Sequence, residues 1–187
     1  MSYRLSCEKY EFIKGEVVAL YEQYNIKKVP IDAFALAYKM GIKLIPYSSL
    51  TGSKLICAKK LSKDGFYIED NYGKDFIFYD DVGASAERIS MTILHEIGHC
   101  VLDHRGNSPE EEAEAMFFAK YAIAPPPLVN LIHPTAPNKI AFCFGLSGTA
   151  SIYSFSYYQK WIASNGKTLK NYEIRLLALF HDYFRRA

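Results

Sequence analysis

The feature that most constrains the fold is a change of hydrophobic period near residue 80. Before it come short runs rich in β-branched and aromatic residues, separated by turn-forming residues: 42–47, 54–61, 65–70 and 74–80. After it, apolar residues recur at intervals of four, which is the spacing of one helix face: Ile89, Ile93, Ile97 and Val101. We therefore expect an α+β fold, in which a small, mostly antiparallel sheet of three or four strands packs against a helix over residues 85–104.

Helical patterns flank this central region. A helix over residues 6–24 has apolar side chains at helical spacing, and a shorter helix after it ends at Gly41. Gly106 is placed to end the central helix. Ser108 and Glu111 then form the pattern of a capping box, which opens a further helix. That helix must end before the run of three prolines that follows it.

The last third of the chain has weaker patterns. Residues 139–148 fit a strand or a buried loop, and residues 149–163 fit a helix or a strand. Residues 168–186 have the pattern of an amphipathic terminal helix. We expect two parts: residues 1–127, which hold the sheet and the central helix, and residues 128–187, a mainly helical C-terminal subdomain.

The central helix carries two histidines four residues apart, with a glutamate after the first. His95 and His99 lie one turn apart on one helix face, so both imidazoles can reach a single ion. Zinc suits such ligands together with a carboxylate, and it leaves a fourth position open. Glu96 projects beside them and can take a proton from a water that the metal activates. An interior helical glycine costs about 1 kcal/mol relative to alanine, so Gly98 indicates that a missing side chain is needed there.

A third ligand is needed. The metzincin spacing would require Gly at position 102 and His at 105, where this chain has Leu102 and Arg105. His104 is nearest, but it lies near the helix end without the expected spacing. A glutamate from the next helix is a better source, and the acidic residues there are Glu110, Glu111, Glu112 and Glu114. Capping and the helix dipole account for the first two, and periodicity does not choose between the last two.

Two segments resemble the ImmA/IrrE family of zinc metallopeptidases: "RISMTILHEIGHCVLDH" at 88–104 and "EEAEAMFFAKYAIAPP" at 111–126. In that family the second helix reads roughly E-x-E-A-N-x-F-A-x-x-L-L-x-P. This chain supplies Glu112, Glu114, Ala115, Phe118, Ala119 and Pro125 in register. Met116 stands where the family commonly has asparagine, and the resemblance covers about residues 65–125.

The resemblance implies a site and its roles. His95 and His99 would be zinc ligands, Glu112 the third ligand, and Glu96 the general base. Glu114 is the alternative third ligand. One Zn²⁺ per chain would be bound. For an oxyanion, candidate donors are a tyrosine, His133 and Arg88.

The resemblance also implies an activity, that of a zinc-dependent metallo-endopeptidase with a zincin-like domain over residues 1–127. The family's substrate is typically a helix-turn-helix transcriptional repressor of a mobile element or stress-response operon, whose cleavage relieves repression. The edge of the strand at 75–80 could align an extended substrate. The alternative is a non-proteolytic, zinc-bearing regulatory module that binds a transcription regulator, which would tolerate Glu96→Gln.

The overall charge and the cysteines exclude some other classes. The chain has 22 Lys and Arg residues against 20 Asp and Glu, without a long basic run, so direct nucleic-acid binding is not expected. The start of the chain lacks the apolar core of a signal peptide, and no stretch is apolar enough to span a bilayer. The four cysteines form no CxxC pair, which favours free thiols. We expect a cytoplasmic protein without a membrane partner.

Overall fold

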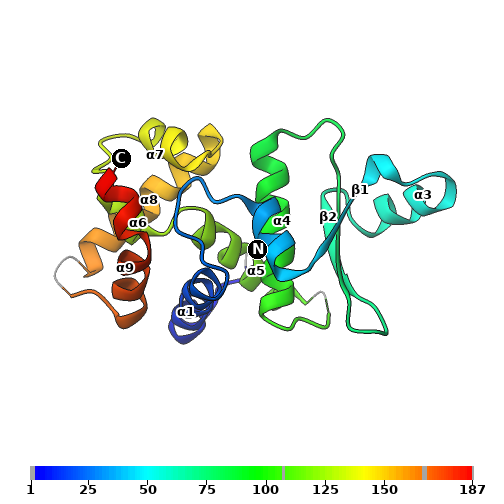
Figure 1. Cartoon of the computed structure of the whole chain (residues 1–187), viewed down its shortest axis with the longest axis horizontal. Coiled ribbons are helices and arrows are strands. Elements are labelled where there is room, and N and C mark those ends of the chain that lie inside the picture. The colour runs from blue at the N-terminus through cyan, green and yellow to red at the C-terminus, as the bar shows by residue number, and fades with distance from the viewer. Residues whose placement is uncertain (1–2, 107, 166–167, 187) are drawn as a thin grey trace. The chain divides into compact units, whose positions relative to one another are not determined.

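The structure, a computed structural model, describes residues 3–106, 108–165 and 168–186 (Figure 1). It has an α+β architecture, as expected, in which helices outnumber strands. The helices are α1 (Cys7–Gln23), α2 (Ala33–Met40), α3 (Gly52–Leu61), α4 (Ala86–Val101), α5 (Pro109–Ile123), α6 (Pro126–Leu131), α7 (Pro137–Phe144), α8 (Gly148–Asn165) and α9 (Asn171–Arg186). The strands are β1 (Lys43–Pro46), β2 (Gly65–Glu69) and β3 (Asp75–Tyr79).

The chain folds into two compact units. The first contains Met1–Leu5 and Asp32–Ala119, and therefore the sheet, α2 to α4 and most of α5. The second contains Ser6–Ile31 and Lys120–Ala187, and therefore α1, the end of α5 and α6 to α9. The expected division into residues 1–127 and 128–187 differs from this one in two respects. The first helix groups with the C-terminal helices, and the first unit ends inside α5.

The three strands form one mixed sheet in the order β1-β3-β2. β2 and β3 pair antiparallel, and the tight turn between them is closed by a hydrogen bond from Asp70 N–H to Lys74 O at 2.9 Å. β1 pairs with β3 in parallel, so the sheet is mixed rather than mostly antiparallel. β3 is the central strand and its Ile77 is fully buried, whereas β1 and β2 each have a free edge, with no further strand beside it among the described residues.

Two segments that were not predicted to be helical, one expected as a strand and one as a strand or a buried loop, lie in helices. Residues 54–61 were expected to form a strand, but they lie in α3, where Ala58 is the one buried side chain. This run lacks the strict alternation of a half-buried strand, and Lys, Leu and Ala are good helix formers. Residues 139–148 fall mainly in α7, which has Pro137 in its first turn and ends at Gly145 in the left-handed conformation. The helical alternative for residues 149–163 is confirmed by α8.

Helix α4 packs on the sheet and on α2 within the first unit. Of the four residues on the predicted apolar face, Ile93 and Ile97 are fully buried, whereas Ile89 and Val101 are half-buried. The helix ends at Val101 and not at Gly106. Its end is a Schellman motif: Asp103 N–H donates to Cys100 O, His104 N–H donates to His99 O, and Asp103 has φ 53°. Aspartate tolerates the left-handed conformation better than most side chains, so glycine is not needed there.

Helix α5 opens with the predicted capping box. Ser108 N–H donates to Glu111 Oε2 at 2.8 Å, and Glu111 N–H donates to Ser108 Oγ at 3.2 Å. The helix then passes close to α4 at Gly98, where a Cβ atom would lie 3.1 Å from Phe118 Cδ1 and 3.2 Å from Ala115 Cα. The missing side chain at Gly98 therefore lets the two helices approach each other, as its place in the sequence predicted.

The second unit is a bundle of helices in which α9 contacts α1 and α6, and α8 contacts α6 and α7. Leu176 and Phe180 of α9 are fully buried. Tyr21 donates its hydroxyl hydrogen to Ala122 O, which joins α1 to the end of α5.

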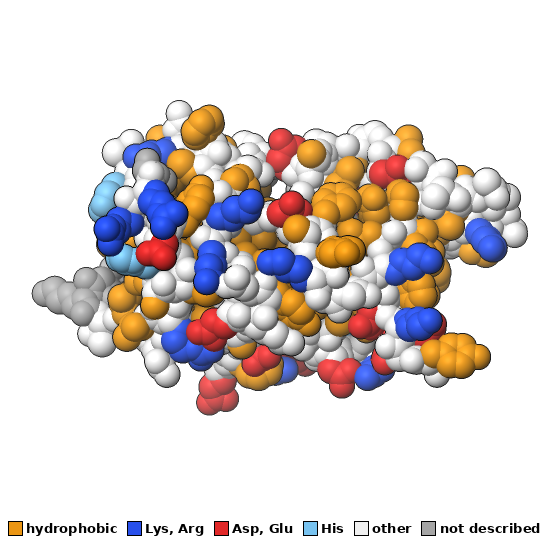
Figure 2. Space-filling view, viewed as in Figure 1, with side chains coloured by type: hydrophobic (Ala, Val, Ile, Leu, Met, Phe, Trp, Pro, Cys, Tyr) orange, Lys and Arg blue, Asp and Glu red, His pale blue; other side chains and the backbone are white. Residues whose placement is uncertain are grey.

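Figure 2 shows Lys and Arg side chains in separate groups on the face viewed, with Asp, Glu and apolar side chains between them. All four cysteines are free thiols. Within the described residues, no helix has both the length and the apolar character that a membrane crossing requires.

Candidate metal centre

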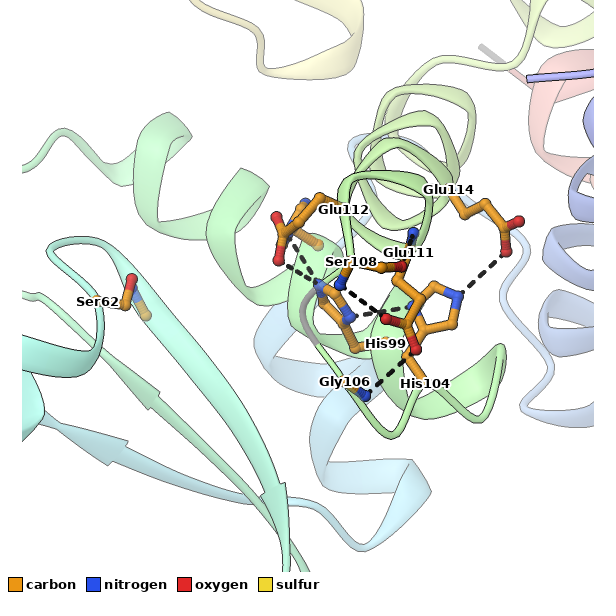
Figure 3. Close-up of polar contacts among 10 residues, drawn as sticks. Ser62, His99, His104, Gly106, Ser108, Glu111, Glu112 and Glu114 are labelled. Atoms are coloured by element: carbon orange, nitrogen blue, oxygen red, sulfur yellow. Dashed lines mark hydrogen bonds and ion pairs between the residues drawn. The ribbon is translucent and has the colours of Figure 1, made fainter. Parts of the chain in front are cut away.

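Two histidines from α4 and one glutamate from α5 converge within the first unit. His95 Nε2 lies 3.1 Å from His99 Nε2. Glu112 places Oε2 3.3 Å from His95 Nε2 and Oε1 3.5 Å from His99 Nε2. Figure 3 shows Glu112 directed toward the histidine rings from the first turn of α5. The donor atoms all lie within 4.8 Å of one another, so this group could hold a metal ion.

The local sequence explains this convergence. The spacing of four residues puts both imidazoles on one face of α4. The capping box fixes the start of α5, and the close approach at Gly98 brings its first turn alongside α4. Glu112 reaches the histidines with a side chain that is 50% exposed, so the group opens to solvent on the glutamate side.

The separations and protonation states of the donors fit a small divalent ion. A tetrahedral ion with bonds of about 2.0–2.1 Å holds its ligand atoms about 3.3 Å apart, close to the observed spacings. Burial lowers the pKa of His95, although the Glu112 carboxylate opposes this. Burial, together with the charges of His95 and His104, lowers the pKa of His99 to about 4. Both rings are therefore neutral near pH 7, which is the form that binds a metal.

Glu96 lies next to this group but is not a member of it. Glu96 is only 6% exposed. Burial and then the nearby Glu112 charge raise the pKa of Glu96 to about 8, against an opposing hydrogen bond from the backbone of Tyr67. A buried carboxyl in a cleft with a pKa near the working pH is suited to proton transfer.

A cleft of about 690 Å³ runs over the centre, between β2 and α4. Its lining includes all four predicted site residues from His95 to Glu112, together with Tyr67 and Met116. Two ion pairs join the β2 side of the cleft to the helix side: Arg88 contacts Asp64 at 2.5 Å, and Arg105 contacts Glu69 at 2.5 Å.

The sequence left two alternatives for the third ligand, and the structure places both elsewhere. Glu114 is not in the ligand group, because its Oε2 lies 3.1 Å from His104 Nε2. His104 lies behind His99, with its Nδ1 3.0 Å from His99 Nδ1. Residues two positions apart on a helix differ by about 200° around its axis, which separates Glu114 from Glu112. Glu114 and His104, which were both considered as possible ligands, therefore lie on the Nδ1 side of the His99 ring, away from the ligand group at its Nε2.

The candidate oxyanion donors fall in different places. Arg88 lines the cleft, where its guanidinium is paired with Asp64. Tyr67 is the tyrosine of the cleft, and it donates its hydroxyl hydrogen to Asp75 Oδ1 at 2.6 Å. His133 belongs to the second unit.

The prediction that residues 75–80 form a sheet edge that aligns a substrate was wrong. These residues form β3, which is paired on both sides, so its main-chain groups are already used. The free edge that lines the cleft belongs to β2, at residues 65–69. Both runs have strand character, and the sequence alone does not show which one is central.

No protein-family model matches this chain. No curated protein matches it either.

Proposed function

We propose that this chain is a zinc-dependent metallo-endopeptidase that resembles the ImmA/IrrE family. The observation that carries the proposal is the joint placement of His95, His99 and Glu112 as a ligand group, with buried Glu96 beside it, in one open cleft. Two neutral imidazoles and a carboxylate are the donor set of a catalytic zinc site, which keeps one position open for substrate or water.

The residues divide the chemistry between them. One Zn²⁺ per chain, held by His95, His99 and Glu112, would supply a Lewis acid that polarises a scissile carbonyl and acidifies water. Glu96 takes a proton from the attacking water as the oxygen forms its bond to the carbonyl carbon. It then delivers that proton to the amine nitrogen as the peptide C–N bond breaks.

The free edge of β2 supports an extended peptide as substrate. Asp64 O accepts from Asp80 N–H at 2.8 Å, and Asp70 N–H donates to Lys74 O, so even-numbered positions direct their main-chain groups toward β3. Odd-numbered positions face the opposite way in an antiparallel pair. The backbone of Tyr67 accordingly reaches Glu96. A peptide added as the next strand would therefore run past the Glu96 carboxylate.

The partner class comes from the family resemblance and not from the cleft. We propose a helix-turn-helix transcriptional repressor, encoded by a mobile element or a stress operon, as the protein that is cut. Cleavage would relieve repression in the cytoplasm. Because 22 Lys and Arg residues are nearly matched by 20 Asp and Glu residues and form no long basic run, we expect no direct nucleic-acid binding by this chain.

The test compares wild type with Glu96→Gln after both are loaded with zinc. Each protein is incubated with a proteome-derived peptide library, and new peptide termini are identified by mass spectrometry. Glu110→Gln is the matched control, because it makes the same chemical change in the first turn of α5 outside the ligand group. We expect wild type and Glu110→Gln to produce the same new termini, and Glu96→Gln to lose at least a hundredfold in rate while keeping its zinc.

Two outcomes would contradict the proposal. If zinc-loaded wild type produces no termini beyond those of Glu96→Gln, the chain is not an endopeptidase, and the zinc-bearing regulatory module becomes the better account. If Glu96→Gln cuts as fast as wild type, the general base is not Glu96.

A further inference from the structure

A second line of polar contacts continues behind the metal centre, from His99 through His104 to Glu114. His99 Nδ1 lies 3.0 Å from His104 Nδ1, and His104 Nε2 lies 3.1 Å from Glu114 Oε2. The side chains of His104 and Glu114 are each only 6% exposed. Figure 3 shows Glu114 and Glu112 on opposite sides of the cluster, with the rings of His99 and His104 between them.

We propose that His104 and Glu114 are positioning residues that hold His99 in the tautomer and orientation needed to bind the metal. This inference rests on the metal site of the proposed function. A metal on His99 Nε2 leaves the ring proton on Nδ1, which donates to His104 Nδ1. His104 then carries its own proton on Nε2 and donates it to the Glu114 carboxylate, which accepts only. Each contact thus has one donor and one acceptor.

The end of α4 builds this chain of contacts. Asp103 adopts φ 53°, and the turn that follows lets His104 N–H donate to His99 O at 3.0 Å. The backbone therefore folds back so that the His104 ring lies against the His99 ring, with centroids 5.0 Å apart. Glu114 closes the chain from α5, two residues after the proposed ligand Glu112. Helix α5 therefore supplies both the proposed ligand Glu112 and Glu114, which supports the other ligand His99 through His104.

The support is specific to one of the two histidines. His95 Nδ1 is buried and has no hydrogen-bond partner among the described residues. His99 Nδ1, in contrast, has His104. Partners of this kind orient a ligating imidazole and raise its basicity, and their loss typically weakens metal binding about 10–100-fold.

The first test measures zinc affinity by competition with a chromophoric chelator. The variants are His104→Ala, Glu114→Gln and the double variant, and Glu110→Gln is the matched control for the change on α5. We expect each single variant to bind one zinc per chain about 10–100-fold more weakly, and Glu110→Gln to bind as wild type does. The double variant should lose little more than His104→Ala alone, because both changes break the same chain.

The second test does not need zinc. Nitrogen-15 NMR of the histidine rings in the zinc-free protein reports which ring nitrogen carries the proton. We expect His104 to be protonated on Nε2 in wild type, with a weaker preference in Glu114→Gln, because a neutral amide oxygen accepts less strongly than a carboxylate. Circular dichroism shows whether each variant folds. If His104→Ala does not fold, the isosteric Glu114→Gln still tests the series of contacts from His99 to Glu114.

The outcomes separate the two proposals. Unchanged zinc affinity in both folded single variants, or His104 protonated on Nδ1, would overturn the positioning role and leave the metal site intact. If wild type binds no zinc even after reconstitution, the proposed function fails, and the ring tautomers still decide whether the chain of contacts exists.

Discussion

At the scale of single residues, Gly98 lies where α4 and α5 come closest. Phe118 and the backbone of Ala115 occupy the space that a side chain at Gly98 would need, with both at 3.1–3.2 Å from an added Cβ. Glycine has a low helix propensity, but its lack of a side chain lets α5 come close enough to α4 for Glu112 to lie near His99. The sequence predicted that a missing side chain is needed at Gly98. It could not identify Phe118 as the neighbour, because Gly98 and Phe118 are 20 positions apart.

We predict that Gly98→Ala destabilises the protein by about 1–2 kcal/mol, because overpacking outweighs the gain in helix propensity. It should also weaken zinc binding, since the added methyl group separates the helices that carry the ligands. Gly15→Ala is the matched control: Gly15 lies inside α1 with nothing within 4 Å of an added Cβ, so it should gain about 0.5–1 kcal/mol. Thermal unfolding measures both. Similar gains for the two variants would show that α4 and α5 are not closely packed at Gly98.

At the scale of elements, the end of α4 decides where His104 lies. Glycine was expected to end this helix at position 106, but the left-handed residue is Asp103. This position could not be predicted from spacing, because aspartate is common in many other local structures. The capping box of α5 was predicted correctly, because its two reciprocal hydrogen bonds depend on residues only three positions apart.

We predict that Asp103→Gly leaves stability unchanged or raises it by up to about 1 kcal/mol, since glycine adopts the left-handed conformation at no steric cost. Asp103→Ala should instead lose about 1 kcal/mol relative to Asp103→Gly. The Asp103–Arg105 ion pair is lost in both variants and is largely exposed, so it cancels in this comparison. Denaturant unfolding with zinc-free protein gives both values. Equal stability of the two variants would contradict the assigned conformation.

Two further elements show where local patterns mislead. Residues 54–61 are apolar enough for a strand, and periodicity cannot separate a short apolar strand from a helical segment. Residues 137–145 do carry a helix signal, namely a proline in the first turn and a glycine at the end of the helix. The segments with long, regular periods, α1, α4 and α9, were correctly predicted to be helical, although the end of α4 was not.

At the scale of the whole molecule, the metal centre is contained in the first unit, and the chain's single tryptophan, Trp161, lies in the second. The grouping of His95, His99 and Glu112 could be predicted because a short motif and a family resemblance mark these residues. The support from His104 and Glu114 and the free edge of β2 could not, because they depend on tertiary contacts between elements. Trp161 donates to Glu173 at 2.6 Å, so its fluorescence reports the packing of the second unit.

We predict that Glu11 makes the second unit sensitive to acid. Burial alone would raise the pKa of Glu11, but hydrogen bonds from Lys14, Lys170 and Tyr172 outweigh it and lower the pKa from 4.5 to about 2. A lowered pKa in the folded state stabilises the protein above about pH 4.5, and this contribution is lost as the pH falls toward 2. Trp161 fluorescence between pH 6 and 2 follows the loss.

Two variants test this assignment. Glu11→Gln should remove part of the pH dependence between pH 4.5 and 2 and should lower stability at pH 6. Glu16→Gln, on the same helix and outside the described ion pairs, is the control and should unfold in acid as wild type does. If Glu11→Gln and wild type have the same acid profile, the Glu11 contacts do not stabilise the folded state.

The measurement that tests the central claim most directly is metal content by elemental analysis, on protein purified without chelator and then equilibrated with excess zinc before desalting. We predict about one zinc per wild-type chain, the same content in Glu110→Gln and Glu114→Ala, and none in His99→Ala or Glu112→Ala. A wild-type protein that binds no zinc after reconstitution would contradict the account. So would a zinc ion that is kept in Glu112→Ala and lost in Glu114→Ala.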